Sequence, residues 1–503
     1  YYSVKTVDGG DDTGYYSYLR SIFFDGDLDF INERYYAHIN RFNSTGYVFS
    51  NWQLGQSVLY LPFFLVGHWL ALLYGALGYP IKADGYSAPY FIGTAIASAT
   101  YLLAGLMIMC GVLKKIVGER IALITSMSIW MASPLLYYTF IRQRMAHTTE
   151  FFLAALFVMM WINFRESNKK LHHAVMGTFL GLLCLVRLIN ANYGVLYIAD
   201  LTFLWFSGQS SASRPQITDT FKNLLCFIGM FLIVLLPQFI AWNQLNGFII
   251  SSYLVDTLQS QAIETSTSSA MLGSKLYDIF FSAKWGLAVA TPLWFVGFLG
   301  LLIPGPVSRS IRFSCLISIA SLIVVILSFV ESDAYGNRYF IAAAVLFAIG
   351  FANFLHSCFS NKLMRHVSIV FVSACVIAQY LMIVQYKVIL PYNHPQFTFE
   401  AFSRWMEVIF DQPVLLLRST NFFRLMGFEQ GAWNFIDGLY LLIFPLAQLG
   451  CLVGVLYLLS GSIKSKRIFD IIRRPKNIVT AGILTSIVLV SIVVITAPDK
   501  SAE

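Results

Sequence analysis

The sequence predicts an all-α polytopic membrane protein, and three observations support that prediction. Hydrophobic residues make up 57% of the 503-residue chain. Charged residues make up only 12%, whereas soluble domains carry roughly 25%. Apolar stretches of about 20 residues, the length that crosses a bilayer core, recur along the chain. A bundle of membrane-spanning helices accounts for all three features, and a single membrane anchor does not.

We expect about twelve membrane-spanning helices, because that many apolar runs are long enough to cross. No long repeat and no low-complexity segment separates them. The seven cysteines form no C-x-x-C pair and mostly lie inside apolar runs, so they predict small core residues rather than a disulfide scaffold. The predicted spans are residues 88–113, 119–140, 148–164, 173–189, 191–207, 222–243, 285–303, 311–331, 338–356, 367–388, 438–460 and 478–497.

The basic residues predict the orientation of these spans. The net charge of +8 comes mainly from short loops that follow every second span, which does not indicate a nucleic-acid-binding surface. Lysine and arginine gather in cytoplasmic loops. The basic residues are Lys114, Lys115, Arg120, Arg165, Lys169, Lys170, Arg214, Lys222, Arg309, Arg312, Lys362, Arg365, Lys464, Lys466, Arg467, Arg473, Arg474 and Lys476. The opposite loops, predicted to be extracytoplasmic, are 141–147, 244–284, 331–337 and 389–437.

The segment 55–79 is long and apolar enough to span, but glycines and a proline interrupt it. Such interruptions favour a buried juxtamembrane or re-entrant helix. Residues 1–54 then lie on the extracytoplasmic side, and we expect a further span before Tyr1. The predicted divisions are a first extracytoplasmic loop with juxtamembrane helices (1–87), a transmembrane module with the loop 244–284 (88–388), and a C-terminal part with the loop 389–437 and the last spans (389–503).

Two adjacent carboxylates, Asp11 and Asp12, follow a Gly-Gly pair and precede an amphipathic helix. A carboxylate at a membrane surface can deprotonate a hydroxyl nucleophile, so either residue is a candidate general base. The alternative is structural, because an acidic residue that caps a helix stabilises it by about 1 kcal/mol. From the residues alone, both interpretations stay open.

A second acidic stretch, Asp25, Asp27 and Asp29, places three acids within five residues. Carboxylate oxygens are ligands for divalent cations. However, Asp25-Gly26 is also a turn signal. We favour the turn, and a divalent metal stays an open alternative, so no metal site and no cofactor are predicted.

Four ionisable residues surround the start of the third span: Arg142, Arg144, His147 and Glu150. The two arginines lie on the predicted extracytoplasmic side, against the charge bias, and a guanidinium binds phosphate in a bidentate manner. His147 and Glu150 are three residues apart and share a helix face. Ionisable groups at the edge of a span line a polar cavity more often than they face lipid. A phosphate-binding group and an Arg144–Glu150 salt bridge are both open alternatives.

Three further cations are candidate phosphate ligands. Arg338, followed by Tyr339, opens a span from the extracytoplasmic side, and we favour a phosphate ligand over snorkelling to lipid headgroups. Arg187 lies near the outer end of its span beside two asparagines, which indicates a polar cavity. Lys284 is a weaker candidate or an anchor at the membrane interface. No Walker A loop, G-x-S-x-G elbow or H-E-x-x-H helix accompanies them.

Taken in order, these motifs resemble those of the GT-C glycosyltransferases, in the branch of protein O-mannosyltransferase-like and aminoarabinose-transferase-like bacterial proteins. The similarity extends over about residues 8–345, and the rest of the chain is similar only in its apolar spans. The segments that carry it are 10–15 (GDDTGY), 25–29 (DGDLD), 55–59 (GQSVL) with 62–63 (PF), 145–147 (MAH) with 151–152 (FF), 281–287 (FSAKWGL) with 291–292 (TP), and 335–339 (YGNRY).

The resemblance implies a GT-C-type transmembrane helix bundle with extracytoplasmic juxtamembrane helices. It also implies an inverting transfer of a sugar from a polyprenyl-phosphate donor by direct displacement. Asp11 stands at the position of the first-loop acid that acts as the base in this family. Asp12 stands where relatives often carry Glu, so which of the two is the base stays open. The family layout also has a span before this loop and a non-crossing segment at 55–79.

The sequence therefore predicts a membrane glycosyltransferase of the bacterial inner membrane, with its active site facing the outside. The expected partners are a polyprenyl-phosphate-linked sugar donor, a glycan, lipid or protein acceptor, and membrane lipids, but no nucleic acid. One alternative is a lipid-linked-sugar flippase or transporter, which predicts an internal repeat and charges near the membrane midplane. A glycan polymerase or ligase that uses longer lipid-linked donors is another. The lack of a repeat and the gathering of charges at one face favour the transferase.

Overall fold

The computed structural model describes residues 11–33, 41–140, 142–207, 217–251, 269–282, 286–328, 334–384 and 386. Within these ranges the chain is helical and forms no β-strand. Two predicted spans, 438–460 and 478–497, lie outside the described residues. The predicted loop 389–437 and the candidate residue Lys284 also lie outside them.

The helices follow the predicted pattern from residue 88 onward. Each span predicted in the described ranges coincides with one helix or with two short helical segments. Six helices of the described residues, α3, α4, α7, α10, α15 and α17, are long and apolar enough to cross a membrane, which supports an all-α membrane protein. The elements are α1 (Asp11–Arg20), η1 (Ser21–Asp25), α3 (Gly55–Ala76), α4 (Ala88–Val117), α5 (Glu119–Met131), α6 (Leu135–Phe140), α7 (His147–Phe164), α8 (Lys170–Val186), η2 (Leu188–Ala191), α9 (Asn192–Ser207), α10 (Ile217–Asn246), α12 (Ser269–Phe281), α13 (Leu287–Ala290), α14 (Pro292–Leu302), α15 (Arg309–Leu327), η3 (Arg338–Phe340), α16 (Ala344–Phe359) and α17 (Lys362–Val384).

Four predicted spans are not single regular helices. The span 173–189 is interrupted at Arg187, whose backbone is extended between α8 and η2. The span 119–140 consists of α5 and α6. Residues 132–134, which include Pro134, separate the two helices. Proline has no N–H for the helical hydrogen-bond ladder and its ring crowds the preceding turn, so the helix ends there. The span 285–303 is interrupted before Pro292 for a related reason, because the residue preceding a proline disfavours helical backbone angles. The span 338–356 starts as a short 3₁₀ turn, and its α-helix begins only at α16.

The segment 55–79 is helical, as predicted, and α3 lies antiparallel to the first half of α4. The Tyr101 hydroxyl donates to the Leu59 carbonyl at 2.7 Å. Farther along α3, Gly67 packs against the Pro89 carbonyl near the start of α4. The last turns of α3 therefore extend past the start of α4. A helix that accompanies only half of a spanning neighbour suits the juxtamembrane assignment, which stays a prediction.

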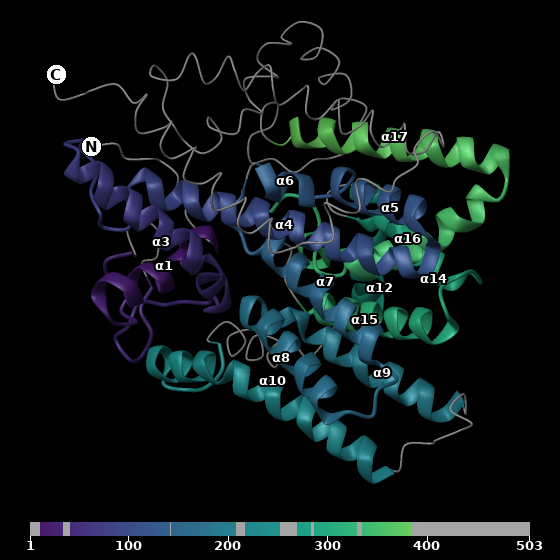
Figure 1. The fold of residues 1–503 in the computed structure, drawn as a ribbon, viewed down its shortest axis with the longest axis horizontal. Helices are drawn as coiled ribbons and strands as arrows, with labels where there is room; N and C mark the ends of the chain where they lie inside the picture. Colours follow the sequence, from purple (N-terminus) through teal and green to yellow (C-terminus); the bar gives the residue numbers. More distant parts are fainter. Residues whose placement is uncertain are drawn as a thin grey trace, which may run out of the picture.

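Polar side chains gather at both ends of the bundle. At one end α7 begins, α8 ends and α1 packs beside them; in Figure 1, α1 (purple) lies at the left of the bundle, where the last turns of α10 reach it. At the other end, Arg165 pairs with Asp200 of α9 at 2.6 Å, and the Trp161 indole donates to the same carboxylate at 2.9 Å. This second end also carries the basic end of α4, where Lys115 donates to Asn163 of α7. The candidate site lies at the first end.

Candidate active site

Four segments that are far apart in the sequence meet at the first end of the bundle. They are the first turn of α1, the start of α7, the break between α8 and α9, and the turn before α16. Each segment contributes charged side chains, and the ion pairs between them join residues up to 327 positions apart. Ionisable residues in an apolar bundle usually face its interior rather than lipid, and they often mark a functional site.

Asp11 is the most exposed of the three carboxylates in this cluster, with 33% of its side chain accessible. Arg338 forms an ion pair with its Oδ2 atom. The Trp52 indole donates to its Oδ1 atom at 3.0 Å. Burial alone would raise the pKa of Asp11, but Arg338, Trp52 and Arg187 outweigh it and lower the pKa to about 2. Asp11 is therefore an anion at neutral pH.

The contact between Trp52 and Asp11 depends on Gly14. A Cβ atom at Gly14 would lie only 2.0 Å from the indole ring, so a larger residue would push Trp52 away from α1. Gly14 follows Asp11 by three residues and lies on the same face of the helix. Glycine inside a helix costs about 1 kcal/mol relative to alanine. The close packing of the Trp52 indole against Gly14 explains why glycine occupies this helical position despite that cost.

Arg338 is presented by a left-handed turn at Gly336, where φ is +61°. This backbone conformation favours glycine. A Cβ atom at Gly336 would also lie 2.5 Å from the Pro134 ring, so the turn packs closely onto the break between α5 and α6. Tyr339 follows, and the guanidinium carbons of Arg187 and Arg338 each lie 5.8 Å from the centre of its ring. Both cations are within the range of a cation–π interaction with one ring.

Asp12 is buried, with 7% of its side chain exposed, and pairs with two arginines. Arg144 Nη2 lies 3.1 Å from its Oδ2 atom and Arg142 Nη2 lies 3.6 Å from its Oδ1 atom. The guanidinium of Arg144 also lies 4.7 Å from the centre of the Phe91 ring. Asp11 and Asp12 form the first turn of α1, where acidic groups favour the helix dipole. Both acids thus lie at the start of a helix, as the structural alternative expected, and the same acids form ion pairs with arginines.

Glu150 is enclosed, with 1% of its side chain exposed. Its Oε1 atom lies 2.7 Å from His147 Nδ1 and 2.9 Å from Arg187 Nη1. Its Oε2 atom accepts a hydrogen bond from Asn190 Nδ2 at 3.1 Å. The alternative salt bridge between Arg144 and Glu150 does not form, because Glu150 pairs with Arg187 and Arg144 pairs with Asp12.

The structure brings together every predicted site residue that it describes. Within the described residues, four guanidiniums lie beside three carboxylates, and guanidiniums are ligands for phosphate. Lys284 lies outside the described residues. The residues brought together are Asp11, Asp12, Arg142, Arg144, His147, Glu150, Arg187, Arg338 and Tyr339.

Two residues of the cluster were missed by sequence reasoning. Tyr15 is buried, and burial together with the nearby acids raises the pKa of its phenol. Its spacing of four residues from Asp11, which places both on one helix face, is a signal that could have found it. Trp52 carries no such signal, because its contact with Asp11 depends on the path of the chain between α1 and α3.

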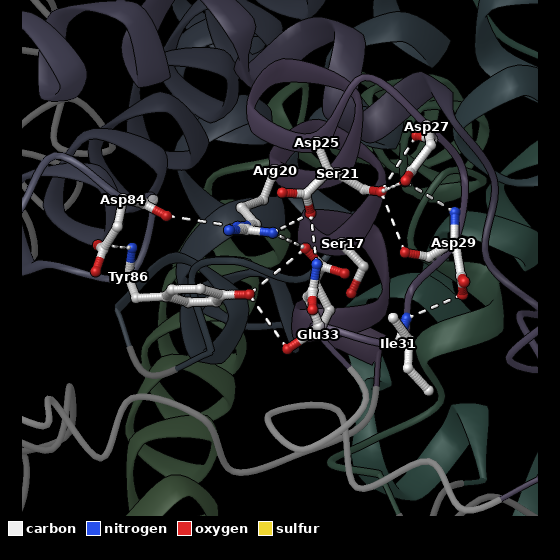
Figure 2. A network of polar contacts seen from close by, with 12 residues as sticks. Ser17, Arg20, Ser21, Asp25, Asp27, Asp29, Ile31, Glu33, Asp84 and Tyr86 are labelled. Atoms are coloured by element: carbon white, nitrogen blue, oxygen red, sulfur yellow. Dashed lines mark hydrogen bonds and ion pairs between the residues drawn. The ribbon is translucent and has the colours of Figure 1, made fainter.

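The second acidic stretch forms the turn that follows α1, as Figure 2 shows. Gly26 has a φ of +72°, and its N–H donates to the Ser21 carbonyl. Asp27 Oδ1 accepts from the Ser21 hydroxyl at 2.8 Å and from the Asp29 N–H at 3.0 Å. The predicted turn is confirmed. Among the described residues, no group of three or more His, Cys, Asp or Glu side chains could hold a metal ion.

Arg20, at the end of α1, joins this turn to the connection between α3 and α4 (Figure 2). Its Nη1 atom pairs with Asp25 and lies 2.9 Å from Glu33 Oε1. Its guanidinium carbon lies 4.7 Å from the centre of the Tyr86 ring, and the Tyr86 hydroxyl donates to Glu33 at 3.5 Å. Glu33 is 1% exposed, and burial raises its pKa to about 6 despite Arg20. This network holds the loop in place.

The candidate site thus offers an ionised, partly exposed carboxylate beside several guanidiniums, at one end of an apolar bundle. A carboxylate of this kind accepts a proton, and guanidiniums bind phosphate. No family model, no curated protein and no solved structure matches this chain. The functional assignment therefore rests on the residues and their geometry.

Proposed function

We propose that this chain is a membrane glycosyltransferase. It moves a sugar from a polyprenyl-phosphate donor to an acceptor hydroxyl on the extracytoplasmic side, with inversion at the anomeric carbon. The observation that supports this most is the direct contact between Asp11 and Arg338. One residue is a proton acceptor and the other is a phosphate ligand, and the proposed reaction needs both in one place.

The proposed reaction is a single displacement. The acceptor oxygen forms a bond to the anomeric carbon while the bond from that carbon to the phosphate oxygen breaks. The acceptor proton passes to the Asp11 carboxylate, and the lipid phosphate leaves with the bonding electrons. Arg338 stabilises the charge that develops on the phosphate. Holding the two substrates in line supplies much of the remaining acceleration.

Asp11 is a better candidate base than Asp12. A third of the Asp11 side chain is exposed, whereas the Asp12 side chain is 7% exposed and lies between Arg144 and Arg142. A base must reach the proton that it takes. We assign the base role to Asp11 and the role of holding the two arginines to Asp12.

The low pKa of Asp11 suits a site that binds a phosphate before it accepts a proton. Arg338 is the strongest cationic influence on that pKa. A phosphate bound to Arg338 shares the guanidinium between two anions, so the pKa of Asp11 would rise toward its ordinary value of about 3.9. Donor binding would therefore make Asp11 a stronger base when the acceptor arrives.

The distribution of basic residues supports an extracytoplasmic site. Lys114 and Lys115 lie at the end of α4, and Lys170 begins α8, at the end of the bundle opposite the cluster. Short basic connections mark the cytoplasmic side. We therefore propose that the cluster lies on the extracytoplasmic side of the membrane, which the family resemblance implies is a bacterial inner membrane.

Transfer assays with the full chain in lipid vesicles test the proposal. The donors are a panel of short-chain prenyl-phosphate hexoses and pentoses, and the acceptors are lipid and glycan extracts. Asp11→Asn is expected to lower transfer by about 10²- to 10⁴-fold, because an amide does not take up the proton. Asp12→Asn, with folding checked by thermal unfolding, is expected to retain more transfer than Asp11→Asn.

Full transfer by the Asp11→Asn variant would reject the assignment of the base. Movement of the lipid-linked sugar across the vesicle membrane without bond formation would reject the enzyme and favour a flippase. Both outcomes are read in the same vesicles, because product analysis reports the new bond and a membrane-impermeant reagent reports the side on which the donor lies.

A further inference from the structure

Glu150 is the most enclosed acid of the candidate site, and both of its oxygens are occupied. His147 and Arg187 share Oε1, and Asn190 donates to Oε2. Only 1% of its side chain is exposed, so its carboxylate does not reach the proton of an acceptor or the oxygen atoms of a phosphate. Glu150 is therefore neither the base nor a direct ligand of a phosphate. Its arrangement indicates that it acts through one of its partners.

Among the partners of Glu150, Arg187 is partly exposed. Its side chain is 12% exposed, whereas the side chain of Glu150 is 1% exposed. Its backbone is extended, with φ −152° and ψ 119°, where α8 ends and η2 begins. In a membrane bundle, irregular backbone of this kind is tolerated where it is buried in protein or lines a polar cavity. The carboxylate of Glu150, from α7, fixes the guanidinium that the break presents.

The guanidinium of Arg187 lies near that of Arg338. Each lies 5.8 Å from the centre of the Tyr339 ring, and both lower the pKa of Asp11. Two guanidiniums close together repel each other unless anions accompany them. Arg338 has Asp11 and Arg187 has Glu150 as its counter-ion. Glu150 thus permits a second cation to stand beside the first.

We propose that Glu150 is a positioning residue that holds Arg187 beside Arg338, so that the two guanidiniums form a two-pronged site for one phosphate. The ligand class is a phosphate ester with an apolar chain, and this identity rests on the proposed function. A phosphate offers several oxygens, and two guanidiniums from different segments can grip it from two directions. Arg142 and Arg144, which pair with Asp12, belong to the other side of the cluster.

Binding measurements on the full chain in lipid nanodiscs test this inference without any sugar transfer. The probes are citronellyl phosphate and the neutral alcohol citronellol. Glu150→Gln keeps the shape of the side chain but removes its charge, and we expect citronellyl phosphate to bind about tenfold or more weakly. Citronellol binding is expected to stay unchanged. The double variant Glu150→Gln/Arg187→Gln is expected to bind no more weakly than Arg187→Gln alone, because Glu150 acts through Arg187.

A second variant and a control guard against a fold defect. Glu150→Asp keeps the charge and shortens the side chain by one methylene, and a selective loss of phosphate binding is expected there too. Asp200→Asn alters the buried ion pair with Arg165 at the opposite end of the bundle. It is expected to lower stability without a selective loss of phosphate binding.

Three results would overturn the inference: unchanged binding of citronellyl phosphate in both Glu150 variants, an equal loss for citronellol, or additive losses in the double variant. A wild-type protein that does not bind citronellyl phosphate would also overturn it. If the wild type binds the phosphate probe, loses it in Glu150→Gln and transfers no sugar, the two-pronged site stands and the proposed transferase fails.

Discussion

Two carboxylates of the first loop, Asp11 and Glu33, each pair with an arginine, yet their pKa values move in opposite directions. The pKa of Asp11 is lowered to about 2, and the pKa of Glu33 is raised to about 6. Burial alone would raise both. The difference lies in the cations that each acid meets.

Asp11 lies within reach of two guanidiniums, Arg338 and Arg187, and of an indole donor. Glu33 shares the single guanidinium of Arg20 with Asp25. Where cations outnumber acids, the charged form of each acid is stabilised and a further anion binds favourably. Where acids outnumber cations, the pKa of the more buried acid rises. The number of cationic partners, together with the deeper burial of Glu33, separates a region suited to phosphate from one that holds a loop.

Removing Arg338 should have the largest effect, because Asp11 then loses its main cationic partner and keeps fewer cations nearby, as Glu33 does. Arg338→Gln is expected to lower transfer by about 10²- to 10³-fold, since the phosphate loses a ligand. The pKa of Asp11 would also rise, because its main counter-charge is gone. The acid limb of the kcat/KM profile of the residual activity should therefore move to higher pH. Transfer measured from about pH 3 to 7 checks both effects.

Arg20→Gln is the matched control, because it removes a guanidinium from the other region. It is expected to leave transfer within about threefold of the wild type. An acid limb that stays in place in Arg338→Gln would show that a group other than Asp11 controls it.

The charged residues of the site could be predicted because each breaks a local rule. Arg338, Arg142 and Arg144 lie against the charge bias of the loops, and Arg187 interrupts an apolar run. The pairing could not be predicted, because it depends on turns and helix directions that hydropathy does not encode. From the sequence, an ion pair of Arg144 with Glu150 was equally plausible, but in the folded structure Arg144 pairs with Asp12.

The helices could be predicted from apolar length, but their breaks were missed. A hydropathy window averages over about 19 residues and passes smoothly across Pro134 and Pro292. Both prolines carry a local signal that the average conceals. The break at Pro134 matters for the site, because the Gly336 turn packs against it and presents Arg338. A local irregularity in one span thus positions a functional residue in another.

Glu33→Gln tests the acid-rich region and should have a smaller effect, on stability alone. The pKa of Glu33 in the fold, about 6, lies above its ordinary value of 4.5. The contribution of this group to stability is therefore fully present below about pH 4.5 and is lost as the pH rises through 6. Gln mimics the neutral acid, so the variant is expected to be more stable than the wild type by on the order of 1 kcal/mol near pH 7.5 and nearly equal to it near pH 4.5. Thermal unfolding at both pH values measures the difference.

Lower stability of Glu33→Gln near pH 7.5 would show that the ion pair with Arg20 outweighs the cost of burial. Glu33 would then behave as Asp11 does, and the proposed contrast between the two regions would fail.

Asp27→Ala should have the smallest effect, and it separates the two regions by function. Asp27 is exposed, and its hydrogen bonds to Ser21 and Asp29 stay within the turn. Losing them is expected to lower stability by about 0.5–1 kcal/mol and to leave transfer unchanged. The variant removes one negative charge, as Asp11→Asn does, so it also tests whether charge alone explains the loss in that variant. Thermal unfolding and the vesicle transfer assay read the two effects separately. A loss of transfer as large as that of Asp11→Asn would mean that both acidic stretches serve the reaction. The number of cationic partners of an acid would then no longer distinguish the two regions by function.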